Sequence, residues 1–260
     1  MHRLHLFEIS DQRWCPDSVR ETITDYMQFG IRMWKSDVEM AFLLRQVFKR
    51  LGTHKVIDLC SGSGGPWFSI LKTLGDVDLP TKICLTDKYP NWATFKYLHD
   101  SSNGKLDFSL ESVDAGCVPK SLAGFRTIFN GFHHFGSSEA FKILQDTVNC
   151  QQGIAIFEIT DRTPWAIFNF MAVSLFMPFC VPFLRPFQWS RLVWTYLIPV
   201  APIVQLFDSF VSCCRTYSVS ELQRMTKKIN TTVYTWEIGK IKPSHAPVPI
   251  TYLLGYPSNT

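Results

Sequence analysis

Short apolar runs alternate with amphipathic stretches through the middle of the chain. The apolar runs have strand character and lie at 56–59, 83–86, 106–113, 127–130 and 154–159. Helical periodicity separates most of them, at 66–74, 92–100 and 138–149. Strands that alternate with helices predict right-handed crossovers, and therefore a doubly wound α/β fold whose mostly parallel sheet has helices on both faces. Such a sheet binds its ligand at the carboxyl ends of its strands.

The two ends of the chain complete this pattern. Residues 16–51 have helical character, and Gly52 predicts a stop. Near the other end, a helix is predicted from 218 to about 229, and two β-rich runs, 232–239 and 249–256, predict a closing antiparallel hairpin. We therefore expect a seven-stranded sheet. Capping boxes predict the starts of two of the flanking helices, with the pairs Ser36 with Glu39 and Ser218 with Glu221.

One segment departs from the regular alternation of strands and helices. Residues 163–207 carry only two charged side chains, Arg185 and Arg191, among many Phe, Trp and Pro residues. The uncharged run 166–184 nearly has the length of a bilayer-spanning helix, about 20 residues, but two prolines interrupt it. Three interpretations are a lid over the site, an element on a membrane surface, and a spanning hairpin. All three favour a lipophilic substrate. A fourth interpretation, that these apolar helices simply pack together as ordinary core, indicates no substrate.

Composition narrows the class of protein. The chain has 260 residues, of which 46% are hydrophobic, enough to bury the core of one large domain. Its net charge of +4 is spread without a long basic run, so nucleic acid is not expected as a partner. The eight cysteines form no CxxC pair, and the N-terminus is too polar for a signal peptide. We expect a cytoplasmic protein, membrane-associated if the apolar segment touches lipid, without a metal site.

A glycine-rich turn follows the first predicted strand. Residues 56–65 read VIDLCSGSGG, and glycines allow a backbone to approach a ligand closely. The Lys-Ser/Thr pair of a P-loop is absent, and a dinucleotide GxGxxG register that starts at Gly62 and Gly64 would place its third glycine at Trp67. Phosphate and dinucleotide ligands therefore fit poorly. The acid Asp58 instead suits a ligand that carries an ammonium group.

The segment 58–64 resembles the first motif of the class I S-adenosylmethionine-dependent methyltransferases, approximately D-x-G/C-x-G-x-G. Further matches follow in the family's order, because Asp87 follows the second strand and Asp114 the third. The resemblance implies that Asp87 accepts bonds from both ribose hydroxyls of the cofactor and that Asp114 lies at its adenine. More narrowly, the chain is similar to bacterial methyltransferase-like proteins without assigned substrates, in stretches such as 6–9 (LFEI) and 215–218 (RTYS).

This resemblance implies S-adenosylmethionine as the cofactor and names no substrate. We divide the single methyltransferase-like domain into an N-terminal helical cap (1–52), a cofactor-binding core (53–161), an apolar lid insertion (162–217) and a closing helix and hairpin (218–260). The residues implied to bind the cofactor are Asp58, Cys60, Ser61, Gly62, Gly64, Asp87, Lys88, Asp114, Ala115 and Asn130.

The end of the fourth strand carries the first candidates for chemistry. Its sequence, NGFHHF from Asn130, resembles the N-x-x-H-H endings of the same superfamily, which face the transferred methyl group. Neighbouring side chains on a strand point in opposite directions, so we expect only one of His133 and His134 to face it. We choose His134 as general base, because a neutral imidazole near its normal pKa accepts a proton at physiological pH, and Asp161 as second choice. Alternatively, a histidine here only packs or bonds locally.

Candidate substrate contacts lie at the end of the fifth strand and after the apolar segment, at Glu158, Asp208, Arg215 and Tyr217. Asp208 and Arg215 alternatively form a structural ion pair, which we favour because an unpaired acid beside apolar helices is costly. The sequence thus predicts methyl transfer from S-adenosylmethionine to a lipophilic small molecule or lipid. One alternative is a non-catalytic cofactor-binding partner of a membrane-associated enzyme. Another is a dinucleotide-dependent oxidoreductase, which the missing third glycine disfavours.

Overall fold

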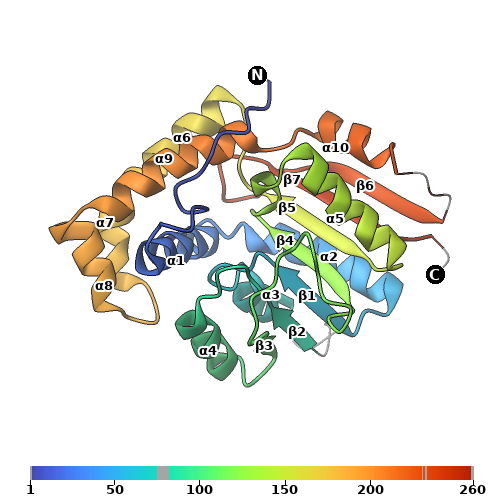
Figure 1. Ribbon diagram of the computed structural model, residues 1–260, viewed down its shortest axis with the longest axis horizontal. Helices are drawn as coiled ribbons and strands as arrows, with labels where there is room; N and C mark the ends of the chain where they lie inside the picture. The colour runs from blue at the N-terminus through green and yellow to red at the C-terminus, as the bar shows by residue number, and fades with distance from the viewer. Residues whose placement is uncertain (1, 75–81, 230, 232, 259–260) are drawn as a thin grey trace.

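A seven-stranded sheet forms the centre of the computed structural model, which describes residues 2–74, 82–229, 231 and 233–258 (Figure 1). The strands are β1 (Lys55–Leu59), β2 (Lys82–Leu85), β3 (Leu106–Phe108), β4 (Phe125–Phe129), β5 (Ile154–Glu158), β6 (Tyr234–Ile241) and β7 (Ile250–Pro257). Their order is β3-β2-β1-β4-β5-β7-β6, and β7 runs antiparallel to both of its neighbours while the other pairs are parallel. The predicted mostly parallel sheet with a closing antiparallel hairpin is confirmed.

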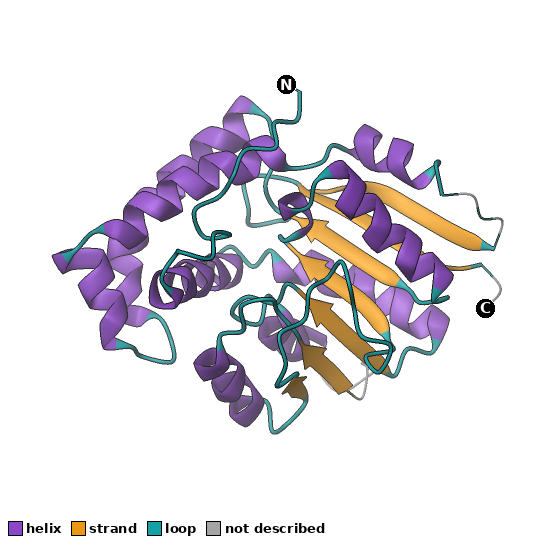
Figure 2. Ribbon diagram, in the orientation of Figure 1, coloured by secondary structure: helices purple, strands orange, loops and turns teal. Residues whose placement is uncertain are grey.

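Helices cover both faces of this sheet (Figure 2). One face packs against α2 (Asp37–Leu51), α3 (Trp67–Leu74) and α4 (Trp92–Ser101), and the other against α5 (Ser137–Asn149) and α10 (Val219–Thr226). Alternation along β1 sends Val56 into the first core and Ile57 into the second.

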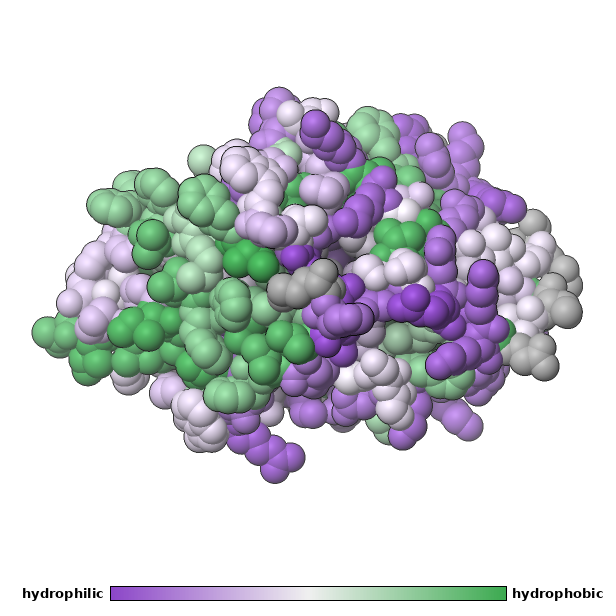
Figure 3. Space-filling model, turned by 90° about the horizontal axis from the view of Figure 1, so that it is seen from above, coloured by the Kyte–Doolittle hydropathy of each residue, from purple (hydrophilic) through white to green (hydrophobic). Residues whose placement is uncertain are grey.

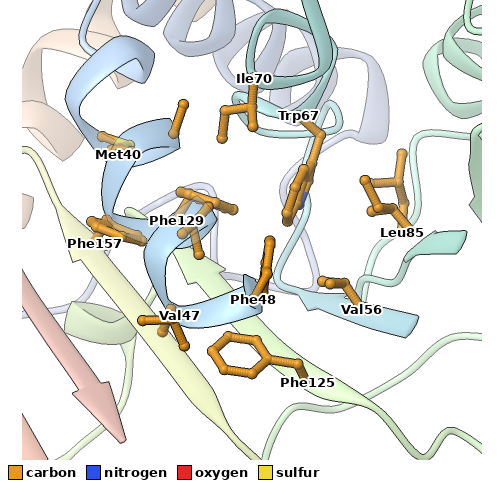
Figure 4. Close-up of a cluster of buried hydrophobic side chains, with 14 of the residues drawn as sticks. Met40, Val47, Phe48, Val56, Trp67, Ile70, Leu85, Phe125, Phe129 and Phe157 are labelled. Carbon is orange, nitrogen blue, oxygen red and sulfur yellow. The ribbon is translucent and has the colours of Figure 1, made fainter. Parts of the chain in front are cut away.

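Aromatic rings fill the first core (Figure 4). Trp67 stacks on Phe48 of α2 at 6.4 Å between ring centroids, and its edge meets Phe129 of β4 at 5.6 Å. Trp67 is the first residue of α3, and only Pro66 separates it from the glycine-rich turn. The buried indole therefore anchors the end of that turn to the sheet.

Several predicted boundaries shift for local reasons. The third strand ends at Phe108 rather than at 113, because the Ser109 side chain bonds the backbone of Glu111 and turns the chain. The expected capping box at Ser36 is wrong, since that side chain caps nothing and the Glu39 carboxylate accepts from the Ser244 amide. The box at Ser218 and the stop at Gly52 are confirmed. Thr232, where a β-rich run was predicted to begin, lies outside the described residues.

The apolar segment folds into helices at one end of the molecule. They are α6 (Pro164–Leu175), α7 (Met177–Cys180), a 3₁₀ turn η2 (Val181–Phe183), α8 (Trp189–Leu192), a π turn η3 (Val193–Leu197) and α9 (Val200–Arg215). Helices α6 and α9 lie side by side (Figure 1), and the group packs on α1 (Asp17–Met33) around a third apolar core. A buried ion pair between Asp25 of α1 and Arg191 of α8 joins the two parts. The Tyr26 hydroxyl adds a bond to the Val173 carbonyl of α6 at 2.6 Å.

Among the described residues, no single helix has both the length and the apolar composition to cross a bilayer. Two pairs of neighbouring helical segments reach that length and composition only when each pair is taken together. They are α6 with Met177–Phe183, bent by 49°, and Trp189–Leu197 with α9, bent by 81°. Hydrophobic side chains nevertheless gather on the outer surface of these helices (Figure 3). The most exposed of the large ones are Leu197, Trp189, Phe179, Phe183, Phe168 and Leu175.

Candidate functional site

A cavity of about 390 Å³ opens at the carboxyl ends of β1, β2 and β4. This volume lies in the range of small-molecule sites, about 300 to 1,000 Å³. Its walls come from the turns after these strands, from the N-terminal segment, and from α1 and α9. The sequence-predicted residues that line it are Cys60, Ser61, Gly62, Asp87, Lys88, Asp114, Ala115, Asn130, His133, His134 and Asp208.

The glycine-rich turn lies at the floor of the cavity. Gly62 and Gly64 have φ angles of 53° and 87°, which L side chains rarely adopt. A Cβ at Gly62 would lie 3.3 Å from the Thr24 methyl of α1, and one at Gly64 would overlap the Leu98 side chain. The turn therefore needs glycine for backbone conformation and for close packing of α1 and α4.

Asp58 lies beneath this turn and does not reach the cavity. Its carboxylate accepts bonds from the Ser61 hydroxyl at 2.6 Å and the Thr127 hydroxyl at 2.5 Å. Burial raises the pKa of Asp58 to about 7, despite the opposing effect of these bonds. The expectation that Asp58 meets a ligand ammonium group is wrong in this structure, because its side chain instead joins β1, β4 and the turn.

This buried acid makes stability depend on pH. The pKa of Asp58 rises from 3.8 to about 7 on folding, so the folded state holds the proton more tightly than the unfolded state. The stability that this bound proton contributes is therefore lost as pH rises from about 4 to about 7. The unfolding free energy of wild type, measured against that of Asp58→Asn by urea denaturation, should therefore fall between pH 4 and 7, by at most about 1.4 kcal/mol per pH unit. Parallel curves for the two proteins would contradict this assignment.

Asp87 presents a carboxylate to the cavity at the end of β2. One oxygen accepts from the Gly62 amide at 2.7 Å and the other from the Tyr89 amide at 2.7 Å. Burial raises its pKa, although these two amides partly offset the effect. Because each carboxylate oxygen has two lone pairs, both can accept a further bond from a ligand hydroxyl.

Lys88 and Asp114 form an ion pair of 2.7 Å at the rim of the cavity. Both side chains are substantially exposed, and the hydrogen bond from Lys88 lowers the pKa of Asp114. Such a pair contributes little to stability. Lys88 and Asp114 line the cavity together with Ala115, so a ligand at this rim can reach both charged groups.

The two adjacent histidines lie on the same side of the chain, contrary to the sequence prediction. Strand β4 ends at Phe129, Asn130 has a φ of 50°, and a 3₁₀ turn, η1 (Phe132–His134), follows. The alternation of a strand therefore does not apply. The ring centroids of His133 and His134 are 4.3 Å apart, and both residues line the cavity.

Glu158 orients His133 and does not line the cavity. One carboxylate oxygen lies 2.6 Å from the ring Nδ1, and the other accepts from the amides of Phe132 at 2.7 Å and His133 at 3.2 Å. Burial alone would raise the pKa of Glu158, but the neighbouring imidazole outweighs it and the pKa is lowered. The second ring nitrogen of His133, Nε2, is buried and has no hydrogen-bond partner among the described residues. Glu158 is thus a positioning residue rather than a substrate contact.

His134 lies beside two acids of the N-terminal segment that the sequence analysis did not single out as functional. Its Nδ1 is 2.9 Å from Asp11 and 3.5 Å from Glu8. Burial lowers the pKa of this ring, but the charges of Glu8 and Asp11 outweigh it and raise the pKa to about 9. This shift favours the protonated ring, so it disfavours the predicted neutral base at this position.

The remaining candidates have structural partners. Asp161 pairs with Lys240 in a separate hollow of about 750 Å³ that it shares with Tyr217, away from the glycine-rich turn. The Tyr217 hydroxyl donates to the Phe135 carbonyl at 2.9 Å. We place the functional site in the smaller cavity because only that one contains the turn after β1 and the ends of several strands.

The predicted pair of Asp208 with Arg215 is also wrong. Asp208 accepts from the amides of Ile9 and Ser10 at 2.8 and 2.9 Å, so it fixes the N-terminal segment over the cavity. Arg215 instead bonds Asp11 at 2.9 Å and the carbonyls of both histidines. Asp208 therefore acts through two backbone amides, and Arg215 acts through the Asp11 carboxylate and two backbone carbonyls.

No family model matches this chain, and no curated protein matches it. Solved structures similar to it include an O-methyltransferase family protein from Burkholderia thailandensis, with 13% identity over 87% of this chain and 58% of that one, at a TM-score of 0.45. The mitomycin 7-O-methyltransferase MmcR is 13% identical over 78% of this chain and 49% of that one, at a TM-score of 0.44. The O-methyltransferase NcsB1 from neocarzinostatin biosynthesis, in complex with S-adenosyl-L-homocysteine and 1,4-dihydroxy-2-naphthoic acid, is 12% identical over 79% of this chain and 50% of that one, at a TM-score of 0.48.

This chain spans about half the length of those solved chains. What each of them binds or methylates belongs to that protein alone, because the likeness is distant in both identity and TM-score.

Proposed function

We propose that the protein transfers the methyl group of S-adenosylmethionine to a lipophilic small-molecule or lipid acceptor. The observation that carries this proposal is the convergence of three groups on one cavity. The glycine-rich turn after β1, the carboxylate of Asp87 after β2, and the His133–His134 pair after β4 all line it. A ligand held by the first two groups would present its reactive end to the third.

The residues of the cofactor half fit S-adenosylmethionine by their chemistry. The turn around Gly62 offers a close backbone approach, and Asp87 has lone pairs free for two ribose hydroxyls. Lys88 and Asp114 would border the adenine at the rim, while Asn130 would lie toward the methionine end. When bound, S-adenosylmethionine supplies a methyl group activated by a positively charged sulfur.

The acceptor half combines polar and apolar walls. Glu8, His133 and His134 form the polar end of the cavity. Apolar walls come from α1 and α6, with Ile23, Met27, Ile31 and Phe170. We infer an acceptor with a polar reacting group and an apolar body. Alignment of that group with the methyl carbon would supply much of the catalysis.

Ligand binding tests the proposal most directly. We expect calorimetry to show binding of S-adenosylmethionine and S-adenosylhomocysteine and no binding of NADH. Mass spectrometry of the purified protein should identify a copurifying apolar compound, which then serves as the first acceptor in methyl-transfer assays. Binding of NADH alone would contradict the proposal and favour the dinucleotide-dependent oxidoreductase.

A second candidate function is a non-catalytic cofactor-binding partner of a membrane-associated enzyme. The exposed apolar surface over α6 to α9 favours it, since such a surface suits contact with lipid or with a membrane protein. Methyl transfer to any acceptor by the isolated protein would exclude this candidate.

We also propose that the same apolar surface contacts lipid. Phe176 and Phe179 are 61% and 73% exposed, and replacing both with Ser removes two apolar anchors. Buried apolar area drives interfacial binding, so sedimentation with liposomes should fall at least about tenfold for this double variant. Leu110→Ser with Val233→Ser, at two exposed positions outside these helices, serves as a control and should bind like wild type. Equal binding by all three proteins would contradict the lipid contact.

A further inference from the structure

Three side chains place potential metal-ligand atoms close together at the polar end of the cavity. Glu8, His133 and His134 each offer one such atom, and these atoms all lie within 4.8 Å of one another. Nε2 of His133 is 3.6 Å from Glu8 Oε1, and Nδ1 of His134 is 3.5 Å from Glu8 Oε2. Each nitrogen faces a different oxygen of the Glu8 carboxylate, at a separation close to the roughly 3.4 Å between two ligand atoms of a tetrahedral site with bonds of about 2.1 Å.

The hydrogen bonding of His133 independently points to a ligand at this place. Its Nδ1 bonds the buried Glu158 carboxylate at 2.6 Å, which fixes the ring and leaves Nε2 as the basic nitrogen. That Nε2 is buried, aimed at Glu8, and without a hydrogen-bond partner among the described residues. A buried acceptor without a partner costs free energy unless a ligand satisfies it. The arrangement of carboxylate, imidazole and open nitrogen is typical of metal sites.

The charges of the neighbourhood favour a cation. Glu8, Asp11 and Glu158 carry three negative charges, and Arg215, 2.9 Å from Asp11 and 3.4 Å from Glu8, carries one positive charge. Arg3, which donates to the His133 carbonyl at 3.2 Å, carries a second positive charge, so the acids exceed the guanidinium groups. Two imidazole nitrogens and a carboxylate oxygen suit zinc and its first-row neighbours better than magnesium or calcium.

We propose that Glu8, His133 and His134 bind a divalent transition-metal ion of the zinc type, whose open position faces the cavity. This proposal deepens the proposed methyl transfer and rests on it for its chemical role. An acceptor hydroxyl at the open position would lose its proton to solvent, because a bound metal lowers the pKa of such a group. The acceptor oxygen would then form a bond to the methyl carbon while the carbon–sulfur bond breaks, with its electron pair left on sulfur.

Metal content provides a test independent of activity. The full chain is stripped with a chelator, equilibrated with Zn²⁺ or Co²⁺, passed over gel filtration and measured by elemental mass spectrometry. We expect about one ion per chain, and Co²⁺ absorption bands typical of tetrahedral nitrogen and oxygen ligation. His133→Gln and Glu8→Gln should lower affinity at least 100-fold, and Glu158→Gln by 10- to 100-fold through the orientation of His133. His245→Gln, at an exposed histidine elsewhere, should bind like wild type.

Circular dichroism of each variant separates loss of a ligand from loss of the fold. Less than a tenth of an ion per wild-type chain, or equal retention by wild type and His133→Gln, overturns the metal site. Cofactor binding measured by calorimetry on the same samples distinguishes the two proposals. A protein that binds S-adenosylmethionine but no metal refutes only the metal site, and one that binds metal but no S-adenosylmethionine refutes only the proposed function.

Discussion

Asp87→Ala should weaken S-adenosylmethionine binding by roughly 30- to 150-fold, which corresponds to about 2 to 3 kcal/mol. In the proposed complex the Asp87 carboxylate accepts two ribose hydroxyls in a half-buried position, and hydrogen bonds to a charged group contribute about 1.5 to 3 kcal/mol each without adding fully. The substitution also releases the amides of Gly62 and Tyr89, which Asp87 now holds at 2.7 Å, so the turn loses part of its order.

Calorimetry with both S-adenosylmethionine and S-adenosylhomocysteine is the appropriate measurement, because the two ligands share the ribose and should weaken by the same factor. Asp87→Asn keeps the shape with a single accepting oxygen and should lie between wild type and Asp87→Ala. Asp107→Ala, an exposed acid on β3, is a matched control that should bind normally. Unchanged affinity in a folded Asp87→Ala protein would remove this residue from the cofactor site.

The end of the cavity at the glycine-rich turn could be predicted from sequence because its parts are local. A strand, an acid and a glycine-rich turn are contiguous in 56–65, and the end of each parallel strand meets the same edge of the sheet. Asp87 and Asp114 therefore both line the cavity, and their contacts with a cofactor stay a prediction. Asp58 shows the limit of this reasoning, since the direction of its side chain depends on Thr127, a partner 69 residues away.

The histidine end of the cavity could not be predicted because it depends on long-range contacts. Glu8 and Asp11 reach the histidine turn from more than a hundred positions earlier in the chain, and Asp208 fixes that segment through the amides of Ile9 and Ser10. No local pattern marks such contacts. The prediction of no metal site relied on the cysteines alone, so it did not consider a set made of two histidines and a distant Glu.

The apolar segment was visible in composition, but its packing was not. The sequence shows charge depletion over 163–207, whereas the structure shows which side of each helix is buried. Arg191, one of its two charged residues, is buried against Asp25 of α1. Removal of one partner of such a pair is costly, so this contact holds the helices next to the cavity. A lid, a surface for lipid, or both are consistent with that placement.

His133→Gln should lower the rate of methyl transfer by roughly 10²- to 10⁴-fold, with S-adenosylmethionine affinity unchanged within about threefold. The reason is the position of Nε2, which faces Glu8 at 3.6 Å within the cavity and has no competing hydrogen bond among the described residues. A Gln amide can still bond Glu158, so the turn is retained, but it offers no basic nitrogen to a metal ion or to the acceptor.

Single-turnover measurements with the identified acceptor provide the test, together with Glu158→Gln and His245→Gln. Glu158→Gln keeps the side-chain volume but weakens the orientation of the ring, so it should lose less activity than His133→Gln and should shift the pH dependence of the rate. His245→Gln should behave like wild type. If a folded His133→Gln protein turns over at the wild-type rate, then neither the His133 imidazole nor a metal ion that it binds is required. Alignment of the acceptor by the sheet and the apolar helices, together with His134, would then have to account for the reaction.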